Sequence, residues 1–257
     1  MNQILFLMAV RNRQERAVAS IKSVVDSGLG KYFDFLIVQD VDQKNVSLMH
    51  FDLSVFNKDT IGKIEIIDVK IGGMFNKTLL LNHGIRMSKN PFIIQQDADI
   101  LFGRPFLLSV LKICSNPSLL NKFLFLCPYV ESEDMKESVE HIGWPPRKKG
   151  DEAGKSFLLY RPQIEAIHGY DERMKIWNEE YDLINRLEAK FGIKRFSLEK
   201  NGIKNIHVTH SNDERSNCTG EINNRNLRIC MENLNNNNLM VNPNGWGEIT
   251  RQYETNF

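Results

Sequence analysis

Two aspartates separated by a single residue, Asp97 and Asp99, follow a short apolar run at residues 92–95. Carboxylate oxygens are ligands that Mg²⁺ and Mn²⁺ prefer, and the burial of two carboxylates without a cation would be costly. The pair therefore indicates a divalent-metal site at the end of a buried strand. Aspartates with this spacing also occur in solvated loops, so the pair alone leaves both interpretations open.

Basic and imidazole side chains elsewhere in the chain could serve the same chemistry. Arg11 and Arg13 directly follow the first apolar run. Guanidinium groups suit phosphate oxygens or the edge of a uracil base, although a solvated turn has the same composition.

His207 and His210 lie three residues apart, so on a strand only one of them would face a metal ion. A single histidine is more often structural or at the surface.

A cluster of acidic residues, Glu179, Glu180 and Asp182, begins an amphipathic segment just after Trp177. One interpretation is a carboxylate general base positioned for a hydroxyl nucleophile. The other is that acidic residues in the first turn of a helix are favoured by the helix dipole. The cluster by itself favours neither interpretation.

The elements that would position these residues alternate between strands and helices in the first hundred residues. Strands are predicted at Ile4–Val10, Phe35–Val38, Lys63–Val69 and Phe92–Gln95, and helices at Arg16–Ser27 and Phe75–Met87. This order indicates a mainly parallel α/β sheet, in which ligands bind at the carboxyl ends of the strands. The polar residues after the first strand and after the strand at 92–95 should therefore share one crevice.

The second half of the chain is less regular. A surface loop is predicted at Glu131–Gly154, a strand at Phe157–Tyr160, and helices at Pro162–Ile167 and Glu179–Lys190. Residues 211–238 are polar and rich in asparagine, which predicts a long mobile segment. Because no internal repeat or abrupt change in composition divides the chain, residues 1–257 are predicted to form one domain.

Composition excludes several classes of protein. The net charge of +1 argues against a surface built to bind nucleic acid, which needs a basic excess. The four cysteines show no CxxC spacing, so we interpret them as reduced thiols and not as a zinc site or a disulfide framework. The first apolar run has seven residues, and no run approaches the ~20 needed to cross a bilayer. These features predict a cytoplasmic protein without a transmembrane segment.

Five segments, taken in order, resemble the β-1,4-galactosyltransferases. They match that family's FRNRQE segment, its FNRAKLLNxG helix, its DxD metal motif, its NGF…WGWGGEDDDxxNRL block and its HSRD segment, at residues 10–15, 75–84, 97–99, 169–187 and 210–213. Bacterial chondroitin synthases and family 2 glycosyltransferases share several of these marks. The resemblance implies a glycosyltransferase of the GT-A fold, a single α/β domain with a mainly parallel central sheet flanked by helices.

The resemblance also implies a role for each matching residue. Uridine diphosphate would be held by Arg11, Arg13, Lys77 and Asp97. A divalent ion, Mn²⁺ or Mg²⁺, would be ligated by Asp99, His210 and His207. Glu180 would be the catalytic base with Glu179 beside it, and the acceptor would be held by Trp177 and Asp182. Residues 1–103 would then form the nucleotide-sugar-binding half, and 104–257 the acceptor-binding half with residues 211–238 as a lid.

The implied reaction is an inverting transfer of galactose or N-acetylgalactosamine from a UDP-sugar to a hydroxyl of a glycan or glycolipid. A glycolipid acceptor would bring the protein to a membrane surface as a peripheral protein. The chain departs from the family where the glycine-rich WGWGGE stretch is reduced to residues 176–179, which leaves the donor sugar open. Two alternatives are a catalytically inactive carbohydrate- or nucleotide-binding module and a metal-dependent nucleotidyltransferase. The nucleotidyltransferase is disfavoured because residues 9–16 contain no glycine-rich phosphate loop.

Overall fold

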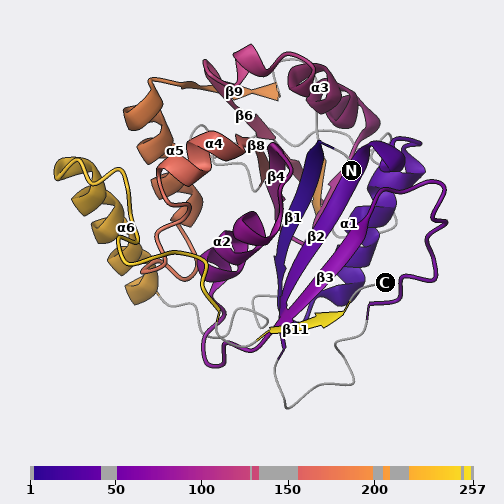
Figure 1. Ribbon diagram of the computed structural model, residues 1–257, viewed down its shortest axis with the longest axis horizontal. Helices are drawn as coiled ribbons and strands as arrows, with labels where there is room; N and C mark the ends of the chain where they lie inside the picture. Colours follow the sequence, from indigo (N-terminus) through magenta and orange to yellow (C-terminus); the bar gives the residue numbers. More distant parts are fainter. Residues whose placement is uncertain are drawn as a thin grey trace.

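The computed structural model describes residues 3–41, 51–127, 129–132, 156–198, 205–208, 220–249 and 252–255. The core of the fold is an eight-stranded sheet with the strand order β11-β3-β2-β1-β4-β8-β6-β9 (Figure 1). Its strands are β1 (Ile4–Val10), β2 (Phe33–Asp40), β3 (Ile64–Val69), β4 (Phe92–Gln96), β6 (Phe123–Cys127), β8 (Ser156–Tyr160), β9 (Lys194–Ser197) and β11 (Gln252–Thr255).

The strands that carry the predicted site are parallel. β1 pairs in parallel with β2 on one side and with β4 on the other, and β2 pairs in parallel with β3. β8 is antiparallel to both of its neighbours, and β11 is antiparallel to β3. A second, three-stranded sheet has the order β5-β10-β7, formed by β5 (Ile100–Phe102), β10 (Asn205–Val208) and β7 (Tyr129–Ser132). The mainly parallel sheet predicted for the first half is therefore confirmed.

Helices cover both faces of the large sheet because its central strands are apolar on both sides. Along β1, Phe6 and Met8 pack into the cluster that contains α1 (Gln14–Asp26) and α3 (Arg104–Cys114), whereas Leu5 and Leu7 pack into the opposite cluster. The opposite cluster contains α2 (Lys77–Met87), α4 (Arg161–Ala166) and α5 (Glu179–Phe191). Short 3-10 turns lie at Gly30–Tyr32 and Pro117–Leu119.

The start of α2 has a local explanation in the sequence. The side chain of Asn76 accepts a hydrogen bond from the backbone N–H of Leu79, a typical N-cap, so the helix begins at Lys77 and not at Phe75. The helix ends at Met87, four residues before Pro91. Lys77 thus occupies the first helical position of α2, next to the carboxyl ends of β1 and β2, which α2 contacts.

The mobile segment predicted at 211–238 is wrong for most of its length. Residues Gly220–Asn235 form helix α6, which packs against α5 as the outermost helix on that side of the molecule (Figure 1). Asparagine is a poor helix former, so polar composition suggested disorder. The helix is held instead by a buried stripe of Asn226, Ile229, Cys230 and Asn233, whose two amides are hydrogen-bonded to distant residues. Residues 211–219 lie outside the described part of the chain.

The described portion of the chain contains no helix that is both long enough and apolar enough to cross a membrane. Most of the predicted surface loop at Glu131–Gly154 lies outside the described residues, except that Glu131 and Ser132 belong to β7.

Candidate active site

Polar residues from six elements meet at the carboxyl edge of the parallel strands. Arg11 and Arg13 follow β1, Asp40 ends β2, and Asp97 and Asp99 follow β4. Lys77 begins α2, Glu179 begins α5, and His207 lies on β10. Parallel strands bring these ends to one edge, and Arg13 after β1 contacts Asp99 after β4 there.

The centre of the site is the Lys77 cluster, in which one lysine binds three carboxylates. The ammonium nitrogen Nζ of Lys77 lies 2.8 Å from Oδ1 of Asp97 and 3.0 Å from Oε1 of Glu179. It also donates a hydrogen bond to Glu180. Lys77 and Glu179 are almost completely buried, whereas the carboxylate of Asp97 is one quarter exposed. The fold thus gathers three of the predicted site residues around the ammonium group of a fourth.

The Lys77 cluster holds one positive side chain and three carboxyl groups, and this excess of carboxyl groups affects the pKa of Glu180. Burial raises the pKa of Glu180 to about 8, the negative charge of Glu179 adds to the increase, and Lys77 opposes it. Burial would lower the pKa of Lys77, but its three carboxylates outweigh burial and hold that pKa well above the ordinary value. The cluster therefore favours a charged lysine, and it favours the protonated form of Glu180 more than water does.

Arg11 and Arg13 are each held by a carboxylate. Nε of Arg11 donates to Oδ2 of Asp40 at 3.0 Å, and its Nη1 donates to the carbonyl of Gly73 at 2.7 Å. The Arg11 guanidinium lies 5.6 Å from the centre of the Phe75 ring. Arg13 donates from Nη1 to Oδ2 of Asp99 at 2.6 Å. These contacts hold both guanidinium groups at the carboxyl edge of the parallel strands.

Asp99 and His207 form the part of the site that could hold a metal ion. β10 pairs with β5, and this pairing brings Nε2 of His207 to 3.4 Å from Oδ1 of Asp99. One carboxylate oxygen and one imidazole nitrogen are suitable ligands for Mn²⁺. The carboxylate of Asp97 is bound by Lys77 through Oδ1. Within the described residues, no group of three or more metal-ligating side chains occurs. His210, the third predicted ligand, lies outside those residues, so the described part supplies two ligands of the predicted set.

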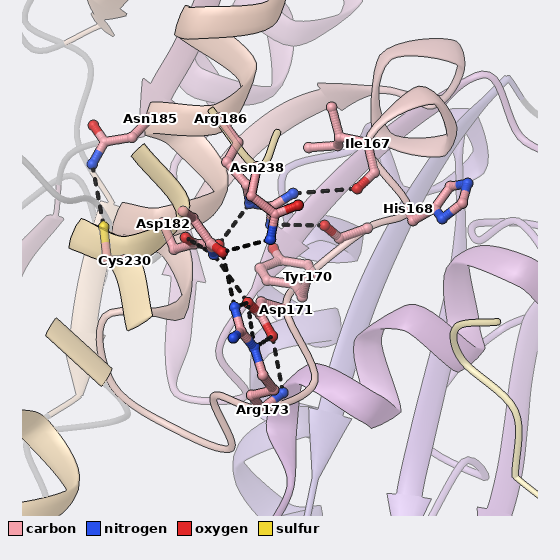
Figure 2. A network of polar contacts seen from close by, with 12 residues as sticks. Ile167, His168, Tyr170, Asp171, Arg173, Asp182, Asn185, Arg186, Cys230 and Asn238 are labelled. Carbon is pink, nitrogen blue, oxygen red and sulfur yellow. Dashed lines mark hydrogen bonds and ion pairs between the residues drawn. The ribbon is translucent and has the colours of Figure 1, made fainter. Parts of the chain in front are cut away.

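The predicted acceptor residues Trp177 and Asp182 lie on either side of the start of α5. Trp177 is partly buried and precedes the helix by two residues. Asp182 belongs to a second buried group, shown in Figure 2, in which its Oδ2 accepts a hydrogen bond from Arg186 at 2.7 Å and its Oδ1 accepts one from Asn233 at 2.9 Å. The structure therefore does not bring Asp182 into the Lys77 cluster.

Two residues of the site were missed by sequence reasoning. Asp40 holds Arg11, and a polar residue at the end of the apolar strand 33–40 was the available signal. Tyr170 is fully buried, and burial, with Glu180 as the next cause, raises the pKa of its hydroxyl well above the ordinary value. The charges of Lys77 and of all three carboxylates in its cluster also affect this pKa. Tyr170 lies within the 169–187 block that resembles the galactosyltransferases, which was the available signal.

Several solved structures have the same overall fold as this chain at low sequence identity. S. aureus TarS 1–349 in complex with UDP-GlcNAc matches with a TM-score of 0.63 and 12% identity, over 91% of this chain and 67% of that one. A mannosyltransferase from Pyrobaculum calidifontis in complex with GDP-Man and Mn²⁺ matches with a TM-score of 0.56 and 11% identity, over 81% of this chain and 57% of that one. No protein-family model and no curated protein sequence matches the chain. The chain has the α/β GT-A fold of these glycosyltransferases, and it spans only part of the mannosyltransferase's length.

Proposed function

We propose that the chain is a metal-dependent, inverting glycosyltransferase that moves a sugar from a UDP-sugar to a hydroxyl of a glycan or glycolipid. The observation that supports this most strongly is the Lys77 cluster. In it, Lys77 joins the largely buried carboxyl group of Glu180, whose pKa is raised, to Asp97, which follows β4 and would face the nucleotide. A carboxyl group whose pKa lies near the working pH can both accept and release a proton, as a general base must.

In the proposed reaction, the acceptor oxygen bonds to the anomeric carbon as the bond from that carbon to the diphosphate breaks. The proton of the acceptor hydroxyl passes to Glu180, which must first be ionised. Lys77 favours that ionised form, because it donates a hydrogen bond to Glu180. A single in-line displacement of this kind inverts the anomeric configuration. Glu179, held by the same lysine, lies beside the base, where it can hold a sugar hydroxyl.

The donor side of the site would use the basic residues after β1. Arg11 and Arg13 present guanidinium groups at the crevice, suited to the uracil edge and the phosphate oxygens, with Lys77 and Asp97 beside them. Asp99 and His207, together with His210, would hold Mn²⁺ or Mg²⁺. When bound, such an ion neutralises the charge of the departing diphosphate.

The resemblance to galactosyltransferases makes galactose and N-acetylgalactosamine the first sugars to test. UDP-GlcNAc is the next, since S. aureus TarS 1–349 forms a complex with it. A role in polysaccharide biosynthesis in the cytoplasm fits these substrates, and a glycolipid acceptor would add peripheral association with a membrane. Residues 1–103 would form the nucleotide-sugar-binding half. The acceptor would bind to residues 104–257, where Trp177 offers an aromatic face to a sugar.

The test is release of UDP from a panel of UDP-sugars, measured on the full chain with Mn²⁺, with Mg²⁺ and with EDTA. Metal-dependent release from one donor, abolished in Glu180→Gln, would support the proposal and identify the sugar. Binding of UDP with Mn²⁺ but no release from any donor, with or without sugar acceptors, would favour the inactive binding module. Absence of UDP binding would contradict both. GDP-mannose is the control donor, because a solved neighbour forms a complex with it.

A further inference from the structure

The backbone just before the catalytic carboxylates is strained. Trp177 and Asn178 both have left-handed conformations, with φ of 70° and 60°. A left-handed conformation is uncommon outside glycine, and two consecutive non-glycine residues in it persist only where the surroundings hold them. Glu179 and Glu180 follow directly as the first two residues of α5. The direction in which α5 leaves this turn therefore decides where both carboxylates lie.

Helix α6 holds this turn through two asparagines. Nδ2 of Asn226 donates to the carbonyl of Ile176 at 2.6 Å and to the carbonyl of Trp177 at 2.8 Å. Nδ2 of Asn178 donates to Oδ1 of Asn223 at 2.7 Å. Asn226 is 1% exposed, so its amide contacts the turn in a site shielded from water. A buried amide that satisfies two carbonyls is costly to remove, because both carbonyls lose their partner.

The turn is held from the opposite side by α2. The backbone N–H of Lys77 donates to the carbonyl of Lys175 at 2.8 Å, one residue before Ile176. The same lysine binds Glu179 and Glu180 through its side chain. The segment 175–178 thus lies between α2, which carries the ammonium group, and α6, which carries Asn226. A shift of this segment would move the two glutamates relative to Lys77.

We propose that Asn226 is a positioning residue. By fixing the left-handed turn at Trp177 and Asn178, it sets the geometry of Glu179 and Glu180 around Lys77 and thereby the rate of the reaction. The consequence for the rate rests on the proposed function. The role of Asn226 in placing Glu179 and Glu180 does not rest on that function, because the placement of Glu180 can be observed without any substrate.

Asn233 provides a matched control on the same helix. It is also fully buried, lies two turns further along α6 on the same face, and donates from Nδ2 to Asp171 at 3.0 Å and to Asp182 at 2.9 Å. These partners belong to the second buried group and not to the turn. A general loosening of α6 should therefore follow from either substitution, whereas loss of the turn should follow only from the substitution of Asn226.

The experiment compares Asn226→Ala with Asn233→Ala and with the exposed Asn224→Ala, using Tm, steady-state kinetics and the ¹³C carboxyl resonances of labelled glutamates. Glu180→Gln assigns the Glu180 resonance. In Asn226→Ala we expect kcat to fall about 10- to 100-fold with the donor KM within about threefold, as misplacement of a catalytic group predicts. The Glu180 resonance should titrate differently from that of the wild type. Asn233→Ala should lower Tm comparably while leaving kcat and the Glu180 titration near those of Asn224→Ala.

Asn223→Ala is the milder second variant, since Asn223 is only partly buried and its loss removes a single bond to the turn. It should change kcat and the Glu180 resonance in the same direction as Asn226→Ala. The proposal is overturned if Asn226→Ala and Asn223→Ala leave the Glu180 titration unchanged, or if Asn233→Ala changes it equally. Absence of turnover in the wild type would contradict the proposed function alone, because the carboxyl titration still decides whether Asn226 places Glu180.

Discussion

Helix α5 contributes buried carboxylates to two ionic groups that differ in how many carboxylates each cation binds. The Lys77 cluster sets one lysine against three carboxylates. The second group, which we call the Arg186 network, pairs Asp182 with Arg186 at 2.7 Å and Asp171 with Arg173 at 2.7 Å. Asn233 donates a hydrogen bond to each of the two aspartates of that network. The arginines and aspartates of the network are labelled in Figure 2.

The pKa values follow this difference. Burial raises the pKa of Glu180 to about 8, the negative charges of Glu179 and Asp97 add to the increase, and Lys77 opposes it only in part. Burial acts in the same direction on Asp171, but hydrogen bonds from Arg173 and Asn233 outweigh it, and the pKa of Asp171 falls below its ordinary value. Within the described residues, Oε2 of Glu179 has no hydrogen-bond partner. In the Arg186 network each aspartate has its own arginine, whereas in the Lys77 cluster three carboxylates share one lysine. Groups with perturbed pKa values gather at functional sites, so the Lys77 cluster is the better candidate for a substrate site.

Glu180→Gln should have the largest effect on activity. Removal of a general base lowers kcat by about 10²- to 10⁴-fold, while UDP affinity should change little because Arg11 and Arg13 are untouched. Single-turnover and UDP-binding measurements test the two halves of this prediction. Glu188→Gln, on the same helix but partly exposed and paired with Arg195, is the control. Retention of more than a tenth of wild-type kcat in Glu180→Gln would remove Glu180 from the role of base.

Arg186→Met should have the largest effect on stability. It leaves the buried carboxylate of Asp182 without its ion-pair partner, and such a change costs about 3–5 kcal/mol of the free energy of unfolding. Chemical denaturation measures the loss. Arg195→Met, which removes the partly exposed pair with Glu188, should cost less than about 1 kcal/mol. Equal losses in the two variants would contradict the view that the Arg186 network is structural.

The Lys77 cluster should make kcat/KM depend on pH near neutrality, whereas the Arg186 network should make stability depend on pH only in acid. Because Glu180 must be ionised to act, kcat/KM should rise about tenfold per pH unit below pH 8 and level off above it. Asp171 has a lowered pKa, so its contribution to stability is present above its unfolded pKa near 3.8 and is lost as the pH falls further. A pH–rate profile measures the effect of Glu180 on kcat/KM, and acid denaturation measures the effect of Asp171 on stability. A kcat/KM that is flat between pH 6 and 8 would contradict the assignment of Glu180.

Lys77→Met should produce a smaller change in kcat/KM than Glu180→Gln. Loss of the ammonium group removes the effect that lowers the pKa of Glu180, so the midpoint of the pH–rate profile should move upward. At pH 7 we expect kcat/KM to fall at least about threefold and to recover partly at higher pH. Lys63→Met, at an exposed surface pair with Glu65, is the control. A downward movement of the midpoint would show that Lys77 does not govern the protonation of Glu180.

The residues themselves determined most of the sheet and the place of the site. Apolar runs at residues 4–10 and 92–95 predicted β1 and β4, and the side chains after them had to meet because the carboxyl ends of parallel strands share one edge. The GT-A fold followed from five short segments in order. Local patterns of this kind are legible in a sequence because strand and helix periodicity depend on neighbouring residues.

The tertiary structure alone decided which charges meet. Lys77 and Glu180 are 103 residues apart, and nothing local distinguishes Glu180 from Asp182, which the fold places in the Arg186 network instead. Helix α6 was hidden for the same reason. Its asparagines predicted a polar, disordered segment from composition alone. In the folded chain, Asn226 donates a hydrogen bond to the carbonyl of Ile176, 50 residues earlier. The free energy of a buried polar group depends on its partner, and only the folded chain specifies that partner.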